Sequence, residues 1–117
     1  MTILTREAIL SAQDLKTETV KVPEWGGEVI ISTMTAAARD AWEMSLVGDG
    51  KGNYNTGNAS ARLVSYCAVN EKGERLFTDK DAEALGKRSA KAMNRVVRVA
   101  QKLNALTDAD FEAAKGN

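Results

Sequence analysis

Residues 22–28, Val-Pro-Glu-Trp-Gly-Gly-Glu, constrain the fold of this chain more than any other segment. Pro23 fixes its own φ angle and has no backbone N–H, so it ends a regular strand. Gly26 and Gly27 can both adopt the positive φ angles that a reversing chain needs. Because stretches with apolar residues at strand spacing flank this segment on both sides, we predict a β-hairpin over about residues 15–33.

Helix-capping residues and apolar spacing predict about four helices after the hairpin. Thr35 and Ser89 are typical N-cap residues, and Thr78–Asp81 resembles a capping box with Asp in place of Glu. Trp42 and Leu46 lie four residues apart, which would place both on one buried helix face. The expected helices cover about residues 36–47, 59–69, 79–85 and 89–106.

The sequence predicts one domain that spans residues 1–117. Four glycines between residues 48 and 58 indicate a flexible surface loop, and we find no phosphate-binding motif there because Gly52 follows Gly50-Lys51 where Ser or Thr would be needed. The fold class is therefore expected to be α+β: a mostly helical domain with an N-terminal β-hairpin packed on about four helices.

Composition argues against most kinds of enzyme. The 117 residues contain no histidine and one cysteine, Cys67, which excludes a Cys–His nucleophile and the usual zinc sites. Cys67 falls on an apolar helix face and is expected in the core. Asp79 and Asp81 are explained by their places at a helix start. We expect no catalytic residue, cofactor or metal, and neither a signal peptide nor a membrane span.

Basic residues form a stripe along the predicted helix at 89–106. Lys+Arg and Asp+Glu are equal at 16 each, yet residues 87–107 contain six basic and no acidic residues. The stripe is either a solvated helix surface or a docking surface for an acidic partner, and nucleic acid is disfavoured because no aromatic residues are interleaved with the charges. The basic stripe consists of Arg88, Lys91, Arg95, Arg98 and Lys102.

Trp25 lies near the predicted hairpin tip and has two interpretations. It can fold back onto the helices as part of the core, or it can stand out as an anchor for a partner, because exposed aromatic residues are frequent at binding hot spots. The sequence favours the core slightly and leaves both open. Trp25 and the basic stripe are the candidate partner-binding residues.

Four segments of the chain carry a resemblance to a known family. They are Val-Pro-Glu-Trp-Gly-Gly at 22–27, Asn-Ala-Ser-Ala-Arg-Leu-Val at 58–64, Gly-Glu-Arg-Leu-Phe-Thr-Asp at 73–79 and Glu-Ala-Leu-Gly at 83–86. In their order, and over about residues 15–108, they resemble the tail assembly chaperones of long-tailed, lambda-like bacteriophages.

The resemblance implies a non-enzymatic function. Members of that family bind the long, apolar tape measure protein in the host cytoplasm, help to bring tail tube subunits to it, and are absent from the mature virion. Many such phages also make a longer form by translational frameshifting. Two alternatives remain open: a small nucleic-acid-binding or regulatory protein that uses the basic helix at 87–102, and a structural tail connector or terminator subunit. The sequence also leaves self-association open.

Overall fold

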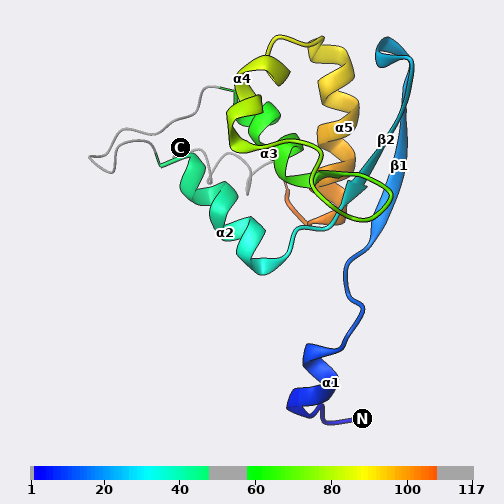
Figure 1. The fold of residues 1–117 in the computed structure, drawn as a ribbon, viewed down its shortest axis with the longest axis vertical. Helices are drawn as coiled ribbons and strands as arrows, with labels where there is room; N and C mark the ends of the chain where they lie inside the picture. Colours follow the sequence, from blue (N-terminus) through cyan, green and yellow to red (C-terminus); the bar gives the residue numbers. More distant parts are fainter. Residues whose placement is uncertain (1, 48–57, 108–117) are drawn as a thin grey trace.

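The computed structural model describes residues 2–47 and 58–107, which form an N-terminal β-hairpin followed by helices (Figure 1). The α+β class predicted from the sequence is therefore confirmed, whereas the predicted loop at 48–58 lies, except for its last residue, outside the described residues. The elements are α1 (Arg6–Leu10), β1 (Thr17–Val22), η1 (Pro23–Trp25), β2 (Gly27–Ser32), α2 (Ala36–Ser45), α3 (Ala59–Cys67), β3 (Ala68–Val69), η2 (Asp79–Asp81), α4 (Ala82–Leu85) and α5 (Ala90–Leu103).

The turn of the hairpin uses one positive φ angle instead of the two that we expected. Pro23 begins a single 3₁₀ turn, and Gly26 ends it at φ 76° with its N–H donating to the Pro23 carbonyl at 3.0 Å. Gly27 instead lies in β2 and pairs with Val22, so its φ is not in the left-handed region. The 3₁₀ turn and Gly26 together connect the paired residues Val22 and Gly27, so a second positive φ angle is not needed.

A third strand replaces the end of the second predicted helix. Helix α3 ends at Cys67, and Ala68 and Val69 then pair antiparallel with Ile31 and Ile30 of β2, which gives the sheet order β1-β2-β3. The prediction of a helix to residue 69 was wrong for its last two residues. Every residue from 63 to 69 is buried, so apolar periodicity carried no sign of the change from helix to strand.

The predicted caps are present, and they set where the other helices begin. Thr35 and Ser89 each accept a backbone N–H of the first turn, at 3.0 Å in α2 and 3.2 Å in α5. The Asp81 carboxylate accepts the backbone N–H of Thr78 at 2.7 Å, as a capping box requires. The first turn of the predicted helix at 79–85 is 3₁₀ (η2), and α5 ends at 103, three residues earlier than expected.

Helix α5 lies between the hairpin and α3, and α2 and α4 pack on other sides of α3 (Figure 1). Trp42 and Leu46 are fully buried, as the sequence predicted. The apolar side of α5 is also buried, except for half-buried Leu103. Its fully or largely buried residues are Ala92, Met93, Val96, Val97 and Ala100.

The N-terminal arm, residues 2–16, extends away from this body (Figure 1). Helix α1 has an N-cap, Thr5, but buries none of its residues. The arm nevertheless carries large apolar side chains, of which Ile3 is 88% exposed. The other exposed ones are Leu4, Ile9, Leu10 and Leu15. None of the helices in the described residues is long and apolar enough to cross a membrane.

Candidate partner-binding surfaces

Every residue of the basic stripe is exposed to solvent. Its second half, from Arg95 to Lys102, lies beside the hairpin, whose strand β1 contacts α5. Arg95 Nη2 lies 3.2 Å from Glu24 Oε2 at the hairpin tip, and Lys102 Nζ lies 3.5 Å from Glu18 Oε1 near its base. Two of the five cations therefore hold the hairpin against α5. Because surface ion pairs each contribute little to stability, the apolar contacts of β1 with α5 carry most of this packing.

Glu24 lies in a local field that favours its charged form. A hydrogen bond from its own backbone N–H is the main cause that lowers the pKa of the carboxyl group below its ordinary value of 4.5. Desolvation opposes this shift, and Arg95 and then Lys91 lower the pKa further. The pKa is lower in the folded chain, so the stabilisation is present above pH 4.5 and is lost as the pH falls through the folded-state pKa.

Replacing Arg95 with glutamine should raise the pKa of Glu24 toward 4.5, because one of the two nearby cations is removed. The measurement is a pH titration of the Glu24 carboxyl carbon by NMR in both proteins. Arg39→Gln, which removes a cation from α2 beside Glu43, is the control and should leave the Glu24 midpoint unchanged. An identical midpoint in the Arg95 variant would contradict the described contact.

The remaining members of the stripe have different surroundings. Among the described residues, no carboxylate lies within ion-pair distance of Arg88, Lys91 or Arg98. Arg88 precedes α5 and donates its backbone N–H to the Leu85 carbonyl at 3.0 Å, so it belongs to the α4–α5 connection. Arg98 lies in the middle of α5, between the two ion pairs made by Arg95 and Lys102.

Trp25 is half-buried and packs against the edge of the core. The side chain is thus neither fully internal nor projected into solvent. It belongs to η1, which contacts α5, so the indole helps to seat the hairpin tip on that helix. Most of the Trp25 side chain is therefore packed against the core, and the remainder is exposed to solvent.

Sequence reasoning missed the N-terminal arm as a candidate surface. The exposure of Ile9 and Leu10 could not be read from the sequence, because an apolar residue can lie in a core or on a folded surface. The available signal was that Ile3, Leu4 and Leu15 lie in a stretch too short to form a core of its own. Exposed apolar residues gathered on one segment are typical of an interaction site.

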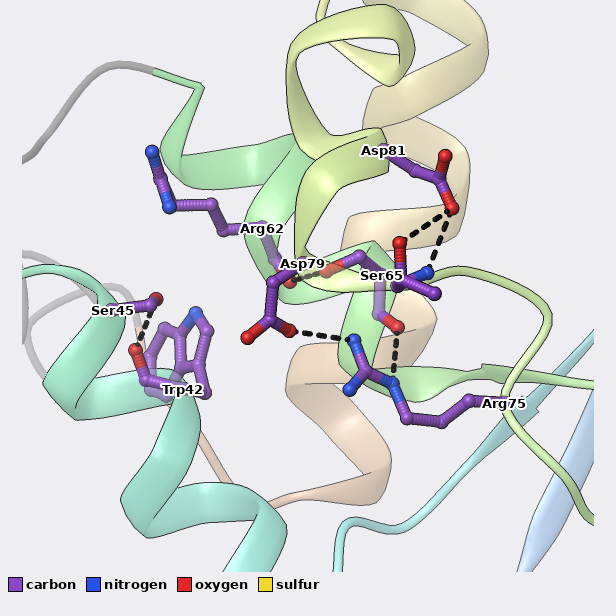
Figure 2. Close-up of polar contacts among 8 residues, drawn as sticks. Trp42, Ser45, Arg62, Ser65, Arg75, Asp79 and Asp81 are labelled. Carbon is purple, nitrogen blue, oxygen red and sulfur yellow. Dashed lines mark hydrogen bonds and ion pairs between the residues drawn. The ribbon is translucent and has the colours of Figure 1, made fainter.

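The polar cluster around Arg75 fastens the segment after β3 to α3 (Figure 2). The guanidinium donates to the Ser65 carbonyl at 3.0 Å, pairs with Asp79 at 3.2 Å and stacks 4.1 Å from the centre of the Tyr66 ring. Burial, followed by the Asp79 carboxylate, raises the pKa of the Tyr66 hydroxyl. Asp79 and Asp81 therefore both have structural partners, and these contacts account for the acidic cluster.

The described residues offer little for nucleophilic or metal chemistry. Cys67 is fully buried, and desolvation raises its thiol pKa to about 12, so it is the core residue that the sequence predicted. Within the described ranges, no three acidic or cysteine side chains come together as a metal site would require. The features that stand out on the described part of the chain are two surfaces, the basic stripe and the apolar arm.

Comparison with known proteins identifies the family to which this chain belongs. The family model for phage tail assembly chaperones matches residues 4–116, and the chain therefore belongs to that family. Among solved structures, the tail assembly chaperone of bacteriophage HK97 superposes with a TM-score of 0.59 and 18% sequence identity, over 87% of this chain and 95% of that one. At this identity the likeness shows a shared fold. No curated protein matches the sequence significantly.

Proposed function

We propose that this chain is a non-enzymatic tail assembly chaperone that binds the tape measure protein in the host cytoplasm, helps to recruit tail tube subunits and is absent from the mature virion. The family match over residues 4–116 carries the proposal. Two surfaces give it a physical basis. The apolar arm offers uncovered hydrophobic side chains to a long apolar client, and the basic stripe supplies charge that steers a client toward the domain.

Reversing the three charges in the second half of the stripe should weaken client binding. In the variant Arg95→Glu, Arg98→Glu, Lys102→Glu, we expect the association rate with the co-expressed tape measure protein to fall about tenfold or more at low salt, and less at high salt. Biolayer interferometry at two salt concentrations measures this. Because Arg95 and Lys102 also hold the hairpin, the single change Arg98→Glu is tested alongside.

A matched control carries the same change in net charge away from the stripe. Lys72, Lys80 and Arg39 lie outside the basic segment 87–107 with exposed or partly exposed side chains, and reversing all three should leave binding close to that of the unmodified chain. If both triple variants bind equally well, charge on the stripe does not steer the client. Mass analysis of mature phage particles tests the other part: a chaperone is absent from them, whereas a connector or terminator subunit is present.

A further inference from the structure

We propose that the free edge of β1, with the cations of α5 beside it, binds an extended acidic segment of a partner protein as a fourth strand of the sheet. The inference rests on the proposed function in one respect, since the segment would belong to a tail component. It goes further by assigning one surface and one conformation: an extended peptide held by backbone hydrogen bonds, with a carboxylate placed against Arg98.

The register of the hairpin identifies which backbone groups are free. β1 is an outer strand of the sheet, and the N–H of Thr33 donates to the Lys16 carbonyl at 2.8 Å. In an antiparallel pair, hydrogen-bonded residues alternate with residues whose N–H and C=O point the other way. Lys16 is thus a hydrogen-bonded position, and the residues at two-residue steps from it, Glu18, Val20 and Val22, also bond to β2. The three residues whose backbone groups point away from the sheet are Thr17, Thr19 and Lys21.

The outer edge of β1 has one protective charge, Lys21, and is otherwise open among the described residues. It is six residues long, and the side chains of Thr17, Thr19 and Lys21 are exposed. In the described part of the chain, no backbone or side-chain group hydrogen-bonds to it. Natural proteins usually shorten, bend or cover such an edge, because it is a ready template for another strand. An extended peptide is the partner that satisfies these groups in regular order.

The position of α5 indicates that the added strand should carry a negative charge. Lys102 lies beside Glu18, and Arg98 is one turn earlier, about 6 Å along the helix axis. Two residues along β1 cover about 6.6 Å, which places Arg98 level with Val20. Because Arg95 and Lys102 already pair with hairpin carboxylates, Arg98 is the cation at mid-strand without such a partner among the described residues. A glutamate opposite Val20 in an added strand would supply one.

The same geometry argues against a second copy of this chain as the occupant. Antiparallel pairing of two β1 strands about a twofold axis would place both α5 helices on one face of the joined sheet. Their basic stripes would then approach each other along the new junction, and like charges destabilise such pairs. An acidic segment paired with β1 would instead be attracted by the cations of α5. Nucleic acid could meet the charges but would leave the edge unpaired.

The test uses a synthetic peptide of about eight residues in which glutamate alternates with valine and threonine. On binding, hydrogen exchange of the Thr17, Thr19 and Lys21 amides, followed by NMR, should slow by about tenfold or more. The amides of Glu18, Val20 and Val22 should be slow with and without the peptide. A glutamine version of the peptide should bind at least about fivefold more weakly, and a version with a central proline should not protect the edge.

Variants of the protein separate charge from fold. Arg98→Glu should reduce peptide affinity by about tenfold, whereas Lys72→Glu, the same change on an exposed turn, should leave it unaltered. The proposal is overturned if the three outward amides are already slow in the free chain, if the peptide binds without slowing them, or if edge protection rises with protein concentration alone. The proposed function fails separately, if the full tape measure protein does not bind a chain whose edge does bind the peptide.

Discussion

Replacing Trp42 with alanine should lower the free energy of unfolding by about 4 kcal/mol, the largest stability effect of any single change considered for this chain. Trp42 is fully buried, and it lies at the interface of α2 with α3. Alanine would leave a cavity that the surrounding helices can only partly fill. Urea denaturation followed by far-UV circular dichroism measures the loss, and the slope with urea should stay the same if only stability changes.

Met44 provides the control for this experiment on the same helix. Its side chain is 67% exposed, so Met44→Ala should change the free energy of unfolding by less than about 0.5 kcal/mol. Trp42→Phe keeps an aromatic ring in the site and should fall between the two. Equal stability of the Trp42 and Met44 variants would show that α2 is not packed on the domain as described.

The second large effect is expected at Asn104, where one side chain ties the end of α5 to the segment after β2. Its Oδ1 accepts the backbone N–H of Met34 at 2.7 Å, and its Nδ2 donates to the Ala100 carbonyl at 2.9 Å. Asn104→Ala should cost about 2 kcal/mol, because the Met34 N–H is left without its partner in a partly buried site. Thermal unfolding and urea titration give this value.

A local readout distinguishes a lost hydrogen bond from a general loss of packing. Hydrogen exchange at the Met34 amide should accelerate in the Asn104 variant beyond the change explained by global stability. Asn94→Ala makes the same chemical change at an exposed position of α5 and should be nearly neutral. An unchanged Met34 amide, or equal losses in the two variants, would rule out the role assigned to Asn104.

The hairpin and helix starts could be predicted because local chemistry determines them. Pro23 and Gly26 specify a turn through their own backbone preferences, and Thr35 and Ser89 satisfy N–H groups only three residues away. β3 could not be predicted in this way. Its two residues become a strand because β2 lies beside them, and an apolar run that is buried throughout has no period to read.

The same distinction between local sequence and long-range packing applies to the candidate surface. The exposed positions of the basic stripe follow from helical spacing, and the buried opposite face of α5 confirms that reasoning. The ion pairs of Arg95 with Glu24 and Lys102 with Glu18 join residues that are 71 and 84 positions apart, so only the packing of the hairpin on α5 could reveal them. That packing also identifies Arg98 as the cation between them.

Because Cys67 is buried, we expect the native chain to react slowly with thiol reagents. Burial raises the pKa of the Cys67 thiol to about 12, so little of the thiolate, which is the reactive form, is present at pH 8. We therefore expect Cys67 to react much more slowly with a label than an exposed thiol would. A single cysteine introduced at Thr19 would accept a fluorophore or spin label alone, and its signal would report events at the β1 edge without interference from the core.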